Sequence, residues 1–162
     1  MGLFNWKSKK RSVELKAPLS GTVIALEQVP DPVFAQKMMG EGLAIQPSGN
    51  TVVAPADGTV TMIASTKHAF GMQLDNGLEL MIHFGLETVN LQGEGFDVLH
   101  KVGDRVSAGT PILKVNVDFM NEKGLCLTTP FILINHAEHP FTIIKGEGTV
   151  TAGEDVLFEI KG

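Results

Sequence analysis

The chain has 162 residues, of which 43% are hydrophobic, and a formal net charge of −5 at pH 7. This length suffices for one domain with its own core, and the negative charge argues against nucleic acid as the main partner. The single cysteine, Cys126, excludes an internal disulfide and fits a reducing cytoplasm. No apolar run approaches the roughly eighteen residues of a membrane span, and no signal peptide is apparent, so we expect a cytoplasmic protein.

The first twelve residues differ from the rest of the chain. An apolar tip at residues 2–6 is followed by four positive charges within residues 7–11. Residues 2–11 could therefore lie on an anionic membrane surface, with the apolar side chains at the lipid boundary. The alternative is a solvated terminus without a partner. We divide the chain into a tail, residues 1–12, and a folded domain, residues 13–162.

The folded part contains an internal duplication. Residues 17–23 (APLSGTV) recur as residues 54–60 (APADGTV), and residues 106–113 are echoed by residues 150–157. Each copy combines a turn with a short strand of β-branched or aliphatic residues. Two interlocked copies of such a unit make a closed sandwich or barrel that protects its edges.

Long helical periodicity is absent from the sequence. Residues 32–39 favour one short helical turn, with Asp31 as the N-cap and Pro32 at the first position. We predict an all-β fold, a duplicated β-sandwich or barrel of the barrel-sandwich type with at most short helical turns. Residues 103–109 (GDRVSAG) resemble the turn-and-strand motif of biotinyl and lipoyl carrier domains, which marks a fold element and leaves several functions open.

Residues 66–89 are predicted to form a β-hairpin. The Asn-Gly pair at residues 76–77 is preferred in two-residue type I′ turns, because both central positions need positive φ. This turn would pair Phe70 with His83 and place His68 on the same face as Phe70. The two histidines would then be diagonal cross-strand neighbours, about 7–8 Å apart at the backbone.

These two histidines form the candidate site. The alternation in residues 80–84 (LMIHF) gives a core face and places His83 on the opposite face. Thr66 continues the face of His68, so a hydroxyl group joins two imidazoles. The simplest alternative is that both histidines are surface residues without a function, and an error of one residue in the register would separate them.

Several kinds of chemistry can use two histidines on a hairpin. A zinc hydrolase needs three or four ligands. His136 and His139 lie far along the chain in a predicted loop, and Gly85 replaces the second histidine of the His-x-His element of zinc peptidases with this type of fold. A biotin- or lipoate-bearing lysine is disfavoured, because Lys37 has no hairpin around it. A phosphoryl carrier needs only a neutral imidazole as nucleophile and a nearby donor for the transferring oxygens.

A non-catalytic binding module is the competing class, since it needs no modified histidine. A phosphoryl carrier instead docks two proteins in turn, so its site should lie in a shallow apolar surface. We expect the following residues to form this surface around the histidines: Val33, Phe34, Met38, Met39, Phe70 and Met81.

Residues 77–89 (GLELMIHFGLETV) resemble the phosphorylation-site signature of glucose-type IIA proteins, components of the bacterial phosphoenolpyruvate-dependent sugar phosphotransferase system. The signature is specific: a glycine, three aliphatic positions, a histidine, an apolar residue, a glycine and a threonine. The similarity extends from about residue 15 to residue 159, with further matches at residues 31–35, 66–70 and 93–96.

The resemblance implies a role for each residue of the site. His83 would accept the phosphoryl group through Nε2, His68 would donate a hydrogen bond to the phosphoryl oxygens, and Thr66 would orient His68. Residues 13–162 would be the IIA phosphocarrier domain. Cys126 would not accept the phosphoryl group, and its leucine neighbours predict that it packs in the core.

The resemblance also implies partners. The donor would be the phosphohistidine of HPr, and the acceptor a cysteine on the IIB domain of a membrane sugar permease, with glucose as the expected sugar. Gly71 and Glu87 would belong to the docking surface, where enteric members carry an aromatic residue and an aspartate.

No cofactor would be required, and we expect no metal in the free protein. His68 and His83 could bind zinc weakly or together with a ligand from a partner. In enteric members the unphosphorylated form also regulates sugar permeases and a kinase. Residues 2–11 are similar to the membrane-associating tail of free-standing members, which would place the protein at the inner face of the membrane.

Overall fold

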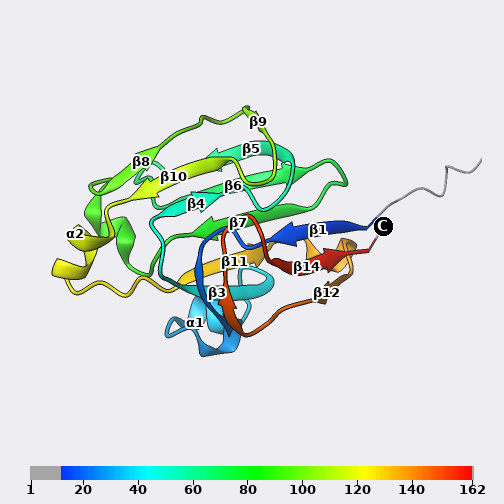
Figure 1. The fold of residues 1–162 in the computed structure, drawn as a ribbon, viewed down its shortest axis with the longest axis horizontal. Coiled ribbons are helices and arrows are strands. Elements are labelled where there is room, and N and C mark those ends of the chain that lie inside the picture. The colour runs from blue at the N-terminus through cyan, green and yellow to red at the C-terminus, as the bar shows by residue number, and fades with distance from the viewer. Residues whose placement is uncertain (1–11, 162) are drawn as a thin grey trace, which may run out of the picture.

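Strands dominate residues 12–161, the part of the chain that the computed structural model describes (Figure 1). These residues form fourteen strands in three antiparallel sheets. The largest sheet has eight strands in the order β13 (Gly148–Val150), β2 (Gly21–Ala25), β3 (Glu41–Pro47), β11 (Thr129–Leu133), β7 (Glu79–His83), β6 (Ala69–Leu74), β5 (Gly58–Ile63) and β9 (Arg105–Val106). The second has the order β1 (Val13–Lys16), β14 (Val156–Ile160) and β12 (Phe141–Ile143). The third has the order β4 (Thr51–Val53), β10 (Pro111–Val115) and β8 (Phe96–Val98).

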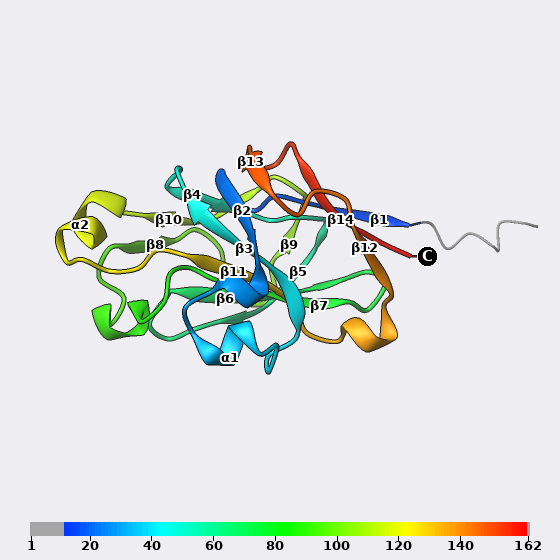
Figure 2. The same cartoon turned by 90° about the horizontal axis from the view of Figure 1, so that it is seen from below.

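Helices among the described residues are short. They are α1 (Pro32–Ala35), α2 (Val117–Glu122) and 3-10 turns at Leu26–Gln28, Thr88–Leu91 and His136–Glu138. The predicted all-β fold with short helical turns is therefore confirmed (Figure 2). None of the helices within residues 12–161 is long and apolar enough to cross a bilayer. Of the predicted tail, residues 1–11 lie outside the described residues, and Ser12 directly precedes β1.

The predicted duplication is visible in two equivalent turns. Asp57 Oδ1 accepts a hydrogen bond from the backbone N–H of Ala108 at 2.8 Å, and Ser20 Oγ accepts one from Ala152 at 2.9 Å. These residues occupy matching positions in the two repeated segments. Strand β9 pairs with β5 in the way that β13 pairs with β2, so the repeat extends to the sheet.

The connections within the two copies differ in length. Between β2 and β3, residues 26–40 contain α1, which begins as predicted at Asp31. The side chain of Asp31 caps it by accepting a hydrogen bond from the backbone of Val33 at 2.9 Å. Between β5 and β6, residues 64–68 form only a tight turn, in which Lys67 has a φ of +64°.

The large sheet buries side chains on both faces near β7. Leu80 and Ile82 point into the main core, and Met81 points into a smaller cluster on the other face. The smaller cluster joins the long connection to β3, β7 and β11, and its buried members are Leu26, Val29, Phe34, Ala44, Met81, Leu86 and Ile132. Because side chains alternate along a strand, His83 shares the face of Met81 and lies beside this second cluster.

Candidate functional site

The tip of the β6–β7 hairpin is a three-residue loop and not the predicted two-residue type I′ turn. Gly77 N–H donates to Leu74 O at 3.0 Å, and Leu74 N–H donates to Leu78 O at 2.9 Å. Only Gly77 has a positive φ in residues 75–77. The side chain of Asn76 accepts a hydrogen bond from Leu78 N–H at 2.9 Å, which favours a turn followed by a left-handed glycine.

This loop shifts the register by one residue from the prediction. His83 pairs with Ala69 and not with Phe70. Phe70 therefore faces the main core, where it is 2% exposed, and the prediction that it lines the partner-binding surface is wrong. The histidines still meet, because His68 lies outside β6 and follows Lys67, whose left-handed backbone redirects the chain. The two imidazole rings are 4.6 Å apart between centroids and nearly perpendicular.

The backbone assigns the proton of His83. His83 is the last residue of β7, and its Nδ1 lies 2.8 Å from the carbonyl oxygen of Gly85. A carbonyl oxygen can only accept, so Nδ1 carries the proton and the Nε2 lone pair of the neutral ring stays free. The ring of Phe34 packs against the imidazole, with 5.1 Å between centroids. In the neutral ring, Nε2 is therefore the nitrogen whose lone pair stays available.

His68 is fixed through its other nitrogen. Its Nδ1 lies 2.8 Å from Oγ1 of Thr66, so the predicted contact between these side chains is present. His68 is buried, and His83 is partly buried. When the hydroxyl of Thr66 donates to Nδ1, the neutral ring of His68 carries its proton on Nε2 and can donate it to a third group.

Burial favours the neutral form of both imidazoles. Desolvation lowers the pKa of His68 below the usual 6.5, and the neighbouring His83 lowers it further, against a smaller opposing effect at Thr66. Desolvation also lowers the pKa of His83, although the hydrogen bond to Gly85 opposes this shift. The neutral form of an imidazole keeps one nitrogen lone pair free, so this environment favours the form that can act as a nucleophile.

The predicted docking surface divides into exposed and buried residues. Phe34, Gly71 and Met81 are buried, so the prediction that they are accessible to a partner is wrong. Phe34 and Met81 instead build the second cluster beneath the site. We use the term docking face for the exposed residues of the predicted surface, which are Val33, Met38, Met39 and Glu87.

Within the part of the chain that the structure describes, no third metal ligand joins the two histidines. Residues 12–161 contain no group of three or more His, Cys, Asp or Glu side chains placed to hold a metal ion. His136 lies against Phe141, beside a segment whose Asn135 binds Gly77 at the hairpin tip. The zinc-hydrolase alternative therefore lacks its ligand set among these residues.

Cys126 is exposed, so the prediction of core packing is wrong. Its leucine neighbours pack against the main core, and the thiol instead points toward the Thr128 hydroxyl, 3.4 Å away. Sequence reasoning also missed Thr88 and Thr129, buried side chains that contact the backbone around Gly85. The sequence signal was the glycine two residues after His83, whereas its positive φ and the threonines that contact its backbone are seen only in the structure.

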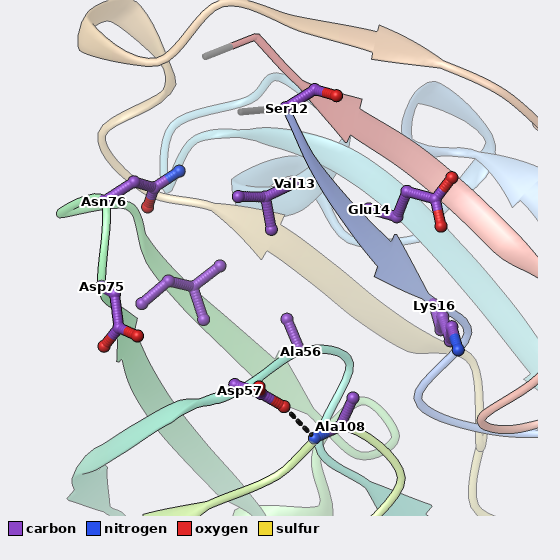
Figure 3. Close-up of a pocket in the computed structure, with 10 residues that line it drawn as sticks. Ser12, Val13, Glu14, Lys16, Ala56, Asp57, Asp75, Asn76 and Ala108 are labelled. Atoms are coloured by element: carbon purple, nitrogen blue, oxygen red, sulfur yellow. Dashed lines mark hydrogen bonds between the residues drawn. The ribbon is translucent and has the colours of Figure 1, made fainter. Parts of the chain in front are cut away.

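A separate cavity lies at the other end of the hairpin. It has a volume of about 500 Å³ and lies between β1, the hairpin tip and the turn at Asp57 (Figure 3). Asp75 on its rim binds Arg105, with 2.8 Å between Oδ2 and Nη2, and Asp57 binds the backbone of Ala108. None of its lining residues belongs to the predicted site.

Comparisons with known proteins identify the family. Residues 13–139 match the sequence profile described as phosphoenolpyruvate-dependent sugar phosphotransferase system, EIIA 1. The chain is 42% identical to the glucose-specific EIIA component of this system from Staphylococcus aureus, over 95% of this chain and 93% of that protein. It is 45% identical to the N-acetylglucosamine-specific EIICBA component from Klebsiella pneumoniae, over 91% of this chain and only 23% of that longer protein.

A solved structure supports the same assignment. Glucose permease IIA from Mycoplasma capricolum aligns with a TM-score of 0.86 and 34% sequence identity, over 98% of this chain and 99% of that one. The similarity in fold and the similarity in sequence thus both extend over nearly the whole chain. The chain belongs to the EIIA 1 family of phosphocarriers in the phosphoenolpyruvate-dependent sugar phosphotransferase system.

Proposed function

We propose that His83 is the phosphorylated residue of this phosphocarrier, with HPr as its donor and a cysteine of a permease IIB domain as its acceptor. The observation that carries this proposal is the 2.8 Å hydrogen bond between His83 Nδ1 and the carbonyl of Gly85. It leaves the Nε2 lone pair free in a ring that burial keeps neutral.

Transfer takes place in two displacements at phosphorus. In the first, Nε2 of His83 attacks the phosphoryl group of phospho-HPr. The bond from phosphorus to the HPr imidazole breaks, and its electron pair returns to that ring. In the second, the IIB thiolate attacks, and the electron pair of the broken bond returns to Nε2 of His83. Few protein groups are needed, because positioning and charge stabilisation supply most of the catalysis.

His68 stabilises the phosphoryl group during its transfer. Its ring lies next to that of His83, and Thr66 holds its Nδ1, so Nε2–H is available to the phosphoryl oxygens. A donor that is already oriented stabilises the charge that develops on these oxygens. We assign Thr66 the role of orienting His68.

The docking face receives both partners in turn. Val33 and Met39 are each 41% exposed, and Met38 is 68% exposed. All three belong to the connection between β2 and β3, in which Phe34 packs against His83. Exposed apolar side chains beside a shallow site suit transient binding of one partner after another. Glu87 adds a negative charge, which suits a basic partner surface.

Glucose is the sugar we propose for the cognate permease. Support comes from the names of the relatives in Staphylococcus aureus and Mycoplasma capricolum, although the Klebsiella pneumoniae relative is named for N-acetylglucosamine. Transfer from the phosphorylated protein to purified IIB domains of either specificity would distinguish them. Faster transfer to the N-acetylglucosamine IIB domain would overturn the choice of glucose.

The remaining expectations concern the location of the protein in the cell, its cofactors and metals, and its regulation. We propose that it works at the cytoplasmic side of the membrane, without a required cofactor. His68 and His83 would supply two ligands to zinc only when a partner completes the set. Contact of residues 2–11 with lipid and regulation by the unphosphorylated form stay predictions.

The decisive experiment is mass spectrometry after incubation with phosphoenolpyruvate, enzyme I and HPr. We expect one acid-labile phosphoryl group, mapped to His83 under alkaline conditions, and none in His83→Ala. His139→Ala, which changes a histidine beside Gly77 at the tip of the hairpin, serves as the matched control and should be phosphorylated normally. Phosphorylation at another residue, or none with HPr active on a control acceptor, would refute the proposal.

A further inference from the structure

The backbone of Gly85 decides which nitrogen of His83 is free. Its carbonyl accepts the hydrogen bond from Nδ1 of His83. Gly85 has a φ of +73°, in the left-handed region that glycine adopts without steric cost. Such a carbonyl keeps its direction only when the two flanking peptide planes are held in place, since each peptide group moves as a rigid unit.

Two buried threonine hydroxyls hold the first plane, between Phe84 and Gly85. Thr88 Oγ1 donates to Phe84 O at 2.6 Å, and Thr129 Oγ1 accepts from Gly85 N–H at 3.3 Å. Thr129 donates its own proton to Leu127 O at 2.9 Å, which directs a lone pair toward Gly85. Both threonines are 0% exposed, so water cannot replace these hydroxyls without rearrangement.

The second plane, between Gly85 and Leu86, is held from both sides. Leu86 N–H donates to Cys126 O at 2.9 Å. In a trans peptide the carbonyl points the opposite way from the N–H, and here it reaches Nδ1 of His83. All four polar atoms of the two planes thus have partners. Residues 126–128 lead into β11, which begins at Thr129 and pairs with β7, so β11 supports both β7 and the loop that follows it.

We propose that Thr129 and Thr88 are positioning residues, which fix the Gly85 peptide and so keep the proton of His83 on Nδ1 and its lone pair on Nε2. The predicted effect on phosphoryl transfer rests on the proposed function, whereas the effect on the His83 ring does not. Without a hydroxyl at Thr129 or Thr88, the first plane loses one of its two anchors. The hydrogen bond from Leu86 N–H to Cys126 O then remains to hold the adjoining plane, and the Gly85 carbonyl can turn away from His83. The imidazole then also adopts the form with its proton on Nε2, which cannot attack through that atom.

The test compares Thr129→Val, which removes the hydroxyl at nearly constant volume, with Thr129→Ser, which keeps it. Nitrogen-15 chemical shifts of the His83 ring in the unphosphorylated protein report the fraction protonated on Nδ1. We expect this fraction to fall in Thr129→Val and phosphorylation by phospho-HPr to slow about tenfold, the loss of roughly one hydrogen bond. Thr129→Ser should restore both.

Thr128 provides a matched control. It is the neighbouring residue, is 7% exposed, and its hydroxyl contacts the Cys126 thiol and not Gly85. Thr128→Val should therefore leave the ring protonation and the transfer rate unchanged. If Thr129→Val does not fold, Thr88→Val and Thr88→Ser repeat the test from the other end of the same peptide plane.

A folded Thr129→Val with unaltered ring protonation and unaltered transfer would overturn the inference. Equal effects of Thr128→Val and Thr129→Val would also overturn it, because they would indicate general loosening of the segment. Failure of the parent protein to be phosphorylated on His83 would refute the proposed function instead. The ring measurement would still decide the positioning role, since it needs no partner.

Discussion

Two equivalent connections of the duplicated unit meet at His83, and they differ in character. The one between β2 and β3, residues 26–40, is long and apolar, and it places Phe34 against the imidazole at 5.1 Å. The one between β5 and β6, residues 64–68, is short and polar, and it places His68 at 4.6 Å. The long connection also carries most of the docking face.

The difference indicates how a symmetric scaffold comes to hold an asymmetric site. The strands that flank each connection pair antiparallel in both copies, with an irregularity between Val60 and Met62 in β5–β6, and the repeated turns are closed by equivalent hydrogen bonds. What differs is the length and polarity of the two connections. We therefore assign partner recognition mainly to the long connection and charge stabilisation to the short one, a division that mutation can test.

A change in the short connection should have the largest effect. We expect His68→Gln to accept a phosphoryl group on His83 but to pass it to a IIB domain about a hundredfold more slowly, because a donor to the transferring oxygens is lost. Rapid-quench measurement of single turnovers separates the two steps. His136→Gln, at the other end of the hairpin, is the control, and normal onward transfer by His68→Gln would contradict the division.

A change in the long connection should weaken docking and leave the chemistry intact. We expect Val33→Ser combined with Met39→Ser to raise the KM for phospho-HPr about tenfold with little change in kcat. Ile143→Ser combined with Ile144→Ser provides the control, because these side chains are comparably exposed, at 47% and 54%, near β12. A fall in kcat as large as the rise in KM would give the long connection a catalytic role.

The pH dependence of stability should reveal the neutral imidazole of the short connection. Burial lowers the pKa of His68 and of His83 below 6.5, so below that pH the unfolded chain binds protons that the folded protein does not. The free energy of unfolding should therefore fall as the pH decreases through 6.5, and level off once both folded-state rings are protonated. Urea denaturation from about pH 7.5 to about pH 5 measures this slope. The slope should be smaller in His68→Gln, and an equal slope would mean that His68 is not held neutral.

The smallest effect should come from the parts that the two copies share. Asp57→Ala and Ser20→Ala each remove one acceptor of a backbone hydrogen bond, so each should lower the free energy of unfolding by about 1 kcal/mol. Phosphoryl transfer should be unchanged in both. Equilibrium denaturation with urea gives the two values, and very unequal costs would indicate that the copies are not energetically equivalent.

Local patterns were sufficient to predict the fold class and the repeated turns. Strand alternation and glycine-containing turns are short-range signals. The hairpin tip was mispredicted, because Asn-Gly also occurs in three-residue loops in which only the glycine has positive φ. The two histidines are close together despite this error in register, because Lys67 adopts a left-handed conformation just before His68. The residue pattern does not reveal that conformation.

The environment of the site was less accessible to sequence reasoning. Val33 is exposed and Phe34 is buried, although both are apolar neighbours in a helix too short to show periodicity. Thr129 supports Gly85 from 44 residues away, a contact that only the pairing of β11 with β7 creates. A hydrogen bond between residues so far apart in the chain depends on tertiary structure and cannot be predicted from the local sequence.

The two described ends of the chain lie side by side, because Val13 pairs with Ile160 (Figure 1). Ser12 lines the cavity at the hairpin tip (Figure 3). His83 is the last residue of β7, at the end away from the tip, and the five residues of this strand span roughly 15 Å. A linker attached at either end would therefore join the carrier at the same place on its surface. Its length would set the local concentration of carrier at a tethered partner without covering the docking face.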